Sequence, residues 1–164
     1  MYSLFSVEYP QEDCGAALTT LKGVIEREGV DVVVGTSLGG FITLALSQVE
    51  GLDLSHVSRF VINPCMVPTV ELPLLKPRKD HPEDKAASAE MVESYRPFVH
   101  DVVFNPQGAE VYGFFGKDDE LFGERYRLLF NQHYGNMSTV IRGGHHGNPA
   151  GADDAARGIM DVLG

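Results

Sequence analysis

The sequence predicts an α/β fold, a doubly wound and mostly parallel sheet of about five strands with helices on both faces. Three observations support this fold class. Short apolar, β-branched runs alternate with helix-length amphipathic segments along the chain. One of these runs leads directly into a glycine-rich turn and an apolar helix. Polar residues able to do chemistry follow several runs, at the end of the sheet where ligands of such folds bind.

The expected elements follow one another without a linker, so residues 1–164 are predicted to form a single domain. At 164 residues with 43% hydrophobic content, the chain is large enough for one core. The strands are expected at 2–7, 31–34, 57–62, 110–115 and 137–141. The helices are expected at 12–28, 38–49, 85–96, 120–134 and 152–163, with Asp13 capping the first and Gly29 ending it. The proline-rich stretch 67–83 shows no periodicity, and the segment 66–100 is expected to border the substrate pocket.

The composition of the chain argues against several classes of binding partner. The formal net charge is −10 and the chain has no basic run, which argues against nucleic acid and against an anionic membrane surface. No apolar stretch reaches transmembrane length, and Met1 is not followed by the basic start of a signal peptide. The two cysteines, Cys14 and Cys65, make neither a disulfide framework nor a zinc site. We therefore expect a cytoplasmic protein that binds no nucleic acid and no membrane.

The most informative segment is Val32–Phe41, which contains the pattern Gly-x-Ser-x-Gly between a predicted strand and a predicted helix. This is the nucleophile elbow of α/β-type serine hydrolases. Gly35 and Gly39 would let strand and helix approach closely around a strained Ser37. The Leu38 N–H, at the helix start, would face a developing oxyanion. Because the pattern also arises by chance, a structural serine in a glycine-rich turn remains the competing interpretation.

Two later strand ends offer the groups that a serine nucleophile requires. Asp118 and Asp119 follow the fourth predicted strand, and His145 and His146 follow the fifth. The order Ser, Asp, His is the order of an α/β-hydrolase triad. Each group also has a simpler explanation. Either aspartate could cap the next helix, and the histidines could be exposed loop residues or, less plausibly, metal ligands.

These segments resemble the small bacterial YqiA/YcfP-like esterases of the α/β-hydrolase superfamily. The resemblance runs from about Ser6 to the C-terminus. It rests on four stretches: Val34–Gly40, Val61–Pro64, Gly116–Glu120 and Thr139–His146. It implies that Asp119 is the triad acid and His146 the triad histidine, with Asp118 and His145 as the alternatives. It also implies that Asn63 and Pro64 shape the pocket, which Met66, at the start of the segment 66–100, is expected to border.

Members of that family usually open with a further strand and a His-Gly or Gly-Phe loop that supplies a second oxyanion N–H. Those features would precede the strand expected at 2–7, and the given sequence begins after them. Leu38 is then the one obvious oxyanion donor, and loss of such a donor costs about 10²–10³ in kcat. An uncovered sheet edge would also favour pairing between copies, so a homo-oligomer is expected.

The sequence thus predicts hydrolysis of a small carboxylic ester or thioester by Ser37, with neither cofactor nor metal. The first alternative is a weak or inactive hydrolase-like binding or scaffold protein, favoured by the absent oxyanion loop. The second alternative is a nucleotide-binding domain that uses Gly35–Gly40 as a phosphate cradle. It is the weaker of the two, because the segment lacks both Gly-x-Gly-x-x-Gly and a Walker lysine.

Overall fold

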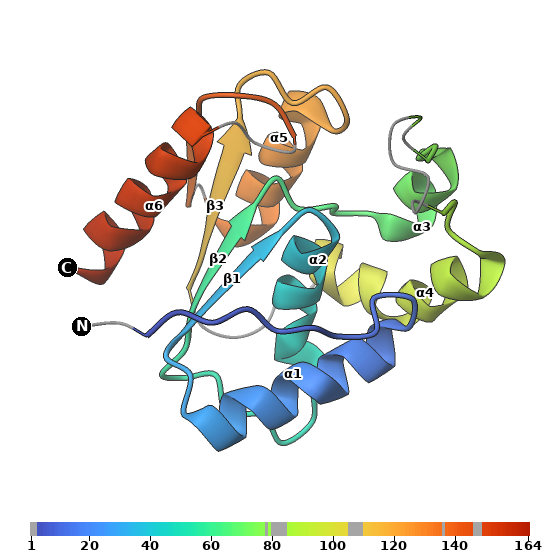
Figure 1. Ribbon diagram of the computed structural model, residues 1–164, viewed down its shortest axis with the longest axis horizontal. Helices are drawn as coiled ribbons and strands as arrows, with labels where there is room; N and C mark the ends of the chain where they lie inside the picture. Colours follow the sequence, from blue (N-terminus) through green and yellow to red (C-terminus); the bar gives the residue numbers. More distant parts are fainter. Residues whose placement is uncertain (1–2, 78, 80–84, 105–109, 136, 146–148) are drawn as a thin grey trace.

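The computed structural model describes residues 3–77, 79, 85–104, 110–135, 137–145 and 149–164 (Figure 1). In chain order the elements are α1 (Cys14–Glu28), β1 (Val32–Thr36), α2 (Leu38–Ala45), the 3₁₀ turn η1 (Leu46–Gln48), β2 (Ser58–Ile62), α3 (Pro68–Glu71), the 3₁₀ turn η2 (Leu72–Leu74), α4 (Ala89–Phe104), β3 (Val111–Gly116), α5 (Gly123–Tyr134), β4 (Ser138–Ile141) and α6 (Pro149–Leu163).

The sheet in the described residues has four strands in the order β1-β2-β3-β4, and all three pairings are parallel. The predicted α/β fold with a parallel sheet is therefore confirmed. The strand expected at 2–7 is wrong, because residues 3–7 are extended but pair with no strand of this sheet. An apolar run alone does not make a strand, since the ladder needs a neighbour for its backbone groups.

The two faces of the sheet are covered unequally. Helices α1, α2, α4 and α5 lie on one face, over the larger core, and α2 packs directly on β1 and β2 (Figure 1). Helix α6 covers the other face, where Phe60, Phe114 and Ile141 form a smaller core with Ala155. Parallel strands in successive order place their crossover helices on the same face, because these crossovers are right-handed.

Local signals explain where α1 begins and ends. The Asp13 side chain accepts a hydrogen bond from the Ala16 N–H at 3.0 Å, and Gly29 follows the helix with a φ of +62°. Both predicted boundaries are therefore confirmed. Helix α4 differs from the expected 85–96, because it starts at Ala89 and continues through Pro97 to Phe104. A proline usually ends a helix, and here the packing of α4 against α1, α2, α3 and α5 overrides that preference.

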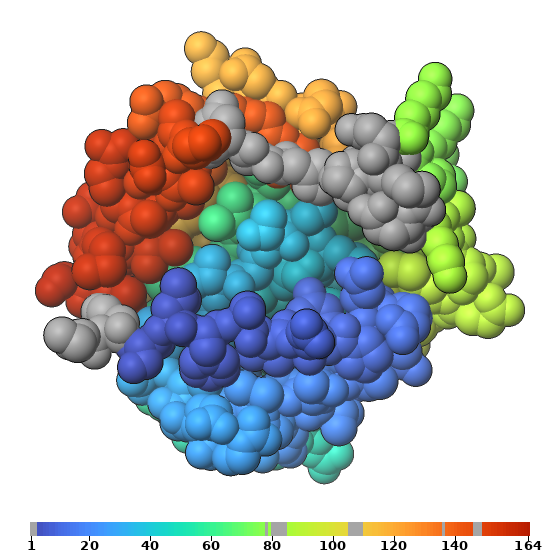
Figure 2. Space-filling view, viewed as in Figure 1, coloured from blue at the N-terminus to red at the C-terminus, as the bar shows by residue number. Residues whose placement is uncertain are grey.

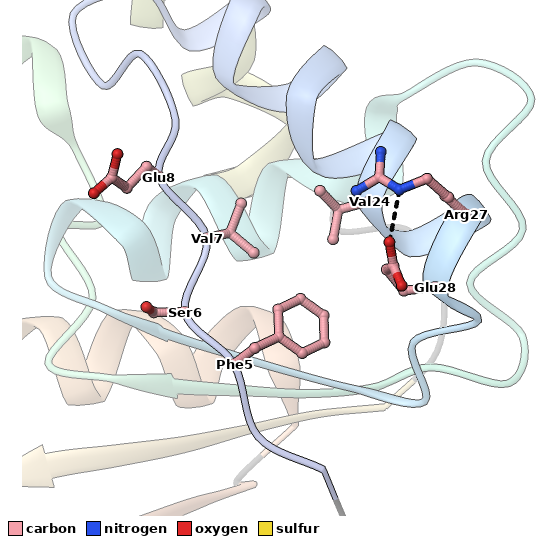
Figure 3. Close-up of a pocket in the computed structure, with 7 residues that line it drawn as sticks. All are labelled: Phe5, Ser6, Val7, Glu8, Val24, Arg27 and Glu28. Atoms are coloured by element: carbon pink, nitrogen blue, oxygen red, sulfur yellow. Dashed lines mark hydrogen bonds and ion pairs between the residues drawn. The ribbon is translucent and has the colours of Figure 1, made fainter.

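Residues 5–8 run beside α1 and, with Val24, Arg27 and Glu28, line a shallow, open pocket of about 300 Å³ (Figure 3). The Arg27 and Glu28 side chains are paired at its rim. None of these residues belongs to the predicted triad. In the space-filling view the N-terminal segment lies across the front of the molecule, below a hollow lined in part by the elements around α2 (Figure 2).

Both cysteines are free thiols buried in the larger core. Burial, with a smaller effect of Asp13, raises the pKa of the Cys14 thiol to about 12, and burial likewise raises the pKa of Cys65 well above its usual value. Across the residues that the structure describes, no helix has the length and apolar character needed to cross a bilayer.

Candidate active site

The elbow residues sit where β1 ends and α2 begins. Ser37 connects the two with a φ of +53° and a ψ of −118°, and α2 starts at the next residue. A positive φ is uncommon outside glycine and concentrates at functional turns. Strand and helix approach so closely that a Cβ on Gly35 would overlap the Gly39 carbonyl and Thr43 Oγ1. Only glycine therefore fits at position 35.

The next two glycines of the elbow face other segments. A Cβ on Gly39 would lie 2.9 Å from the Tyr9 hydroxyl, and a Cβ on Gly40 would lie 2.9 Å from Pro64. Tyr9 belongs to the extended N-terminal segment, which the structure thus places against the start of α2. The Tyr9 hydroxyl has no hydrogen-bond partner in the described part of the chain. Sequence reasoning gave Tyr9 no place near the site, because nothing local connects it to Gly39.

A histidine ring lies between the serine hydroxyl and a carboxylate. His145 Nε2 is 2.8 Å from Ser37 Oγ, and His145 Nδ1 is 3.0 Å from Asp119 Oδ2. With a neutral imidazole, Nδ1–H donates to Asp119 and Nε2 accepts the serine O–H. The side chain of His145 has no exposed surface and that of Asp119 is 4% exposed. The three groups therefore form one continuous hydrogen-bonded chain, in which the histidine and the carboxylate are buried and Ser37 is half-buried.

The histidine in this chain is His145, where the family resemblance implied His146. His146 lies outside the described residues, and the structure gives no position for it. The geometry brings the alternative, His145, into contact with Ser37 and Asp119, and the expectation for His146 stays untested. Neighbouring residues of a loop direct their side chains differently, and the spacing after Gly143-Gly144 does not tell which of two adjacent histidines turns inward.

The acid beside His145 is Asp119, and its carboxylate has two tasks. Oδ2 faces the histidine, whereas Oδ1 accepts the N–H groups of Leu121 and Phe122 at 2.9 and 3.0 Å. Asp119 thus closes a local turn and contacts the histidine at the same time. The helix-cap role that the sequence offered is wrong, because α5 begins at Gly123 with Phe122 as its N-cap and has no side-chain cap bond. Burial opposes ionisation, but the hydrogen bonds from His145 and these two N–H groups outweigh it and hold the pKa of Asp119 below its usual value.

Asp118, the alternative acid, points elsewhere. Its residue is exposed, and its backbone N–H donates to the Gly143 carbonyl at 3.1 Å. Asp118 thus joins the β3 and β4 loops through its main chain and does not contact the His145 ring.

Two further residues hold His145, and neither was assigned a role from the sequence. The Glu120 carboxylate accepts the His145 backbone N–H at 3.1 Å. The Phe122 ring meets the imidazole edge to face, with centroids 4.4 Å apart and planes at 86°. Glu120 lies in the stretch Gly116–Glu120 that resembles the esterase family, so its contact with the histidine loop could have been predicted from its acidic side chain. No feature of the sequence indicated the Phe122 contact, because that contact depends on how two loops pack.

The residues expected to shape the pocket are buried. Pro64 packs against Gly40, and Met66 has no exposed surface and belongs to the larger core. Asn63 is 2% exposed, and its amide is bonded to the loops around it. The structure thus places these three residues in buried positions next to the elbow and the His145 loop, and their role in a pocket stays a prediction. Of the segment 66–100, the structure describes α3, η2 and α4, with 78 and 80–84 outside the described residues.

The Leu38 N–H lies at the head of α2, one residue after Ser37, and has no acceptor among the residues that the structure describes. The first backbone bond of this turn runs from the Gly40 N–H to the Ser37 carbonyl at 3.0 Å. A free N–H at a helix start, next to a nucleophile, can bind a developing negative charge. Within the described residues, no cluster of three or more His, Cys, Asp or Glu side chains could hold a metal ion.

The fold has many known counterparts. The chain superposes on a provisionally assigned hydrolase from Agrobacterium vitis S4 with a TM-score of 0.75 at 19% identity, covering 93% of this chain and 69% of the other. It superposes on alpha/beta hydrolase domain-containing protein 10 from mouse with a TM-score of 0.70 at 16% identity, covering 92% and 69%. For Est1E from Butyrivibrio proteoclasticus the TM-score is 0.66 at 18% identity, covering 93% and 71%.

These likenesses define the fold. The chain has the α/β-hydrolase fold, with Ser37, Asp119 and His145 at the carboxyl ends of β1, β3 and β4. No protein-family model and no curated protein sequence matches the chain. At identities below 20% the similar structures establish the architecture, and function has to be argued from the site.

Proposed function

We propose that this protein is a serine hydrolase that cleaves a small carboxylic ester or thioester through Ser37, His145 and Asp119. The observation that supports this most is the continuous chain of contacts from Ser37 Oγ through the His145 ring to Asp119. A serine hydroxyl becomes a competent nucleophile near neutral pH only beside such a base, and the base needs an orienting acid.

In the proposed reaction, Ser37 Oγ attacks the carbonyl carbon of the substrate while its proton moves to His145 Nε2. The carbonyl π electrons move to oxygen, and the Leu38 N–H donates to that oxyanion. The tetrahedral intermediate then expels the alcohol or thiol, which takes the proton from His145. Water repeats the sequence on the acyl-serine and releases the carboxylic acid. Asp119 stays ionised and stabilises the imidazolium.

The ionisation of Asp119 supports this role. Its pKa lies below the usual value for a carboxyl group, so Asp119 is a carboxylate throughout the neutral range. The contact with Nδ1 holds the ring in the orientation that leaves Nε2 facing Ser37. The proposed chemistry requires no cofactor and no metal.

The first test is labelling of the intact, folded protein with a fluorophosphonate probe, followed by mass measurement and peptide mapping. We expect one adduct on Ser37. The adduct should disappear in Ser37→Ala and fall strongly in His145→Ala, whereas His146→Ala should be labelled nearly as fast as wild type. Strong loss in His146→Ala with retention in His145→Ala would contradict the assignment of the base to His145.

A hydrolase-like binding or scaffold protein is the second candidate. This function is favoured because we identify one oxyanion donor, the Leu38 N–H, among the described residues, and a site with one donor stabilises the oxyanion less than a site with two. An absence of adduct on well-folded wild-type protein would favour this second function. The narrower resemblance to YqiA/YcfP-like esterases and the cytoplasmic location stay predictions from the sequence.

A further inference from the structure

The turn after β2 makes two backbone hydrogen bonds with Ser37. The Ser37 N–H donates to the Ile62 carbonyl at 3.0 Å, and the Cys65 N–H donates to the Ser37 carbonyl at 2.9 Å. Ile62 and Cys65 flank the turn residues Asn63 and Pro64. The main chain of Ser37 is therefore held from both sides by this turn, and a displacement of the turn displaces the nucleophile.

The Asn63 side chain extends from the same turn to the loop that contains the base. Its Nδ2 donates to the His145 carbonyl at 3.0 Å, with a longer contact of 3.4 Å to the Gly144 carbonyl. Its Oδ1 accepts the Gly116 N–H at 2.6 Å, at the end of β3. One buried amide thus connects the turn that holds Ser37 with the β3 end and with the main chain of His145.

The backbone of Asn63 also favours this position of the turn. Its φ is +44°, a conformation that asparagine and aspartate tolerate better than other residues with a side chain. Its N–H donates to the Phe114 carbonyl at 2.8 Å, which continues the β2–β3 ladder past the end of β2. The main chain of Asn63 is thus held in place, and the hydrogen bonds of its amide, which use both the donor and the acceptor, orient the side chain.

We propose that Asn63 is a positioning residue that sets the distance between Ser37 Oγ and the His145 ring. The inference rests on the proposed serine-hydrolase function and deepens it. Asn63 does not touch the substrate; it acts by holding the two loops on which the nucleophile and the base lie. Misplacement of reacting groups by about 1 Å can cost about 10²-fold in rate, so a tie between these loops matters for catalysis.

The variant Asn63→Asp removes the hydrogen-bond donor of this side chain and keeps its acceptor. Aspartate has nearly the same shape, tolerates the positive φ and keeps an acceptor for the Gly116 N–H. Its ionised second oxygen, however, would face the carbonyl oxygens of His145 and Gly144 and repel them. When protonated, the same oxygen can donate to the His145 carbonyl again. The ratio of the mutant rate to the wild-type rate should therefore rise as pH falls through the pKa of Asp at position 63.

The measurement is the rate of fluorophosphonate labelling, together with kcat and KM on a p-nitrophenyl ester, between pH 4.5 and 8 with folding checked by circular dichroism. For Asn63→Asp we expect the labelling rate and kcat to fall by about 10–100-fold at pH 8, with KM changed by less than about twofold. Asn131→Asp is the control, because it also charges an amide whose Oδ1 is buried, on α5 away from the site. It should lower the melting temperature while leaving the labelling rate of the folded protein unchanged.

A second readout does not depend on turnover. The Nδ1–H that His145 shares with Asp119 should give a far-downfield proton resonance, absent in His145→Asn and present in Ser37→Ala. Asn63→Asp should shift or broaden this resonance. If wild type shows the resonance but no serine adduct, the proposed function fails, and the response of the resonance to Asn63→Asp still decides the positioning role. An unshifted resonance, or a rate and pH profile equal to wild type, would overturn the inference.

Discussion

At the scale of single residues, the Asp119 carboxylate combines the bonds of a local turn with a long-range contact to a histidine. Asp119 uses Oδ1 to bind the Leu121 and Phe122 N–H groups and Oδ2 to bind His145. The two turn bonds to Oδ1 fix the orientation in which Oδ2 meets the histidine. A substitution at this position should therefore affect both activity and stability.

Asp119→Asn keeps the shape and an acceptor for the two turn N–H groups but cannot hold the same histidine tautomer. We expect a fall in kcat of about 10⁴-fold, the size seen when other triads lose this charge. A pKa lowered in the folded state stabilises the protein above the unfolded pKa of about 3.9, and this contribution is lost as pH falls through the folded pKa. Urea titrations at pH 6 and pH 3 should therefore show a smaller loss of stability in Asp119→Asn than in wild type. Equal losses would contradict the lowered pKa.

At the scale of elements, the junction of β1 and α2 was the part best predicted from the sequence. A strand, a Gly-x-Ser-x-Gly turn and a helix form one local unit, so spacing along the chain is enough to place Ser37 and Leu38. The close contact of Gly35 with Gly39 and Thr43 then excludes any side chain at position 35. Gly39 faces only the end of the Tyr9 side chain, which can move.

This difference predicts unequal costs for two similar substitutions. Gly35→Ala should lower the free energy of unfolding by about 1–3 kcal/mol or more, because the new methyl group meets backbone. Gly39→Ala should cost less, and Tyr9→Phe should recover part of that cost by removing the hydroxyl 2.9 Å from the new Cβ. Urea denaturation of the three single variants and the Gly39→Ala/Tyr9→Phe double variant checks this. Equal costs at positions 35 and 39 would contradict the geometry.

At the scale of the whole molecule, the sheet ends at β1, within the part of the chain that the structure describes. This strand contains three valines, and Val34 is 45% exposed at the edge. It has no charged residue and no proline, the residues with which natural edge strands avoid pairing. An apolar edge of this kind is the physical basis for the predicted homo-oligomer.

The oligomer prediction can be checked by light scattering over a range of concentrations. We expect the apparent mass of wild type to rise with concentration and that of Val34→Lys to stay at one chain, because a charged edge residue disfavours strand pairing. Val34→Thr is the matched control, since it keeps the β-branched shape without a charge and should still associate. A wild-type mass of one chain at all concentrations would contradict the prediction.

The larger core protects both thiols of the folded protein. Burial raises the pKa of Cys14 and of Cys65, so neither forms a reactive thiolate near neutral pH. We expect a disulfide reagent such as DTNB to modify less than one thiol per chain in buffer and two per chain in guanidinium chloride. Fast modification of the folded protein would show that the core opens readily.

The sequence by itself determined the α/β class, four of the five expected strands, the elbow with Ser37, and the pair of loops that contain an acid and a histidine. These features depend on periodicity and on residue order, which are local properties of the chain. Only the tertiary structure decided the remainder. It placed His145 against Ser37 and Asp119, left residues 3–7 outside the sheet and turned Asn63 toward the His145 loop. Each of these outcomes depends on contacts between segments far apart in the chain, which fix the direction of a side chain or the partner of a strand.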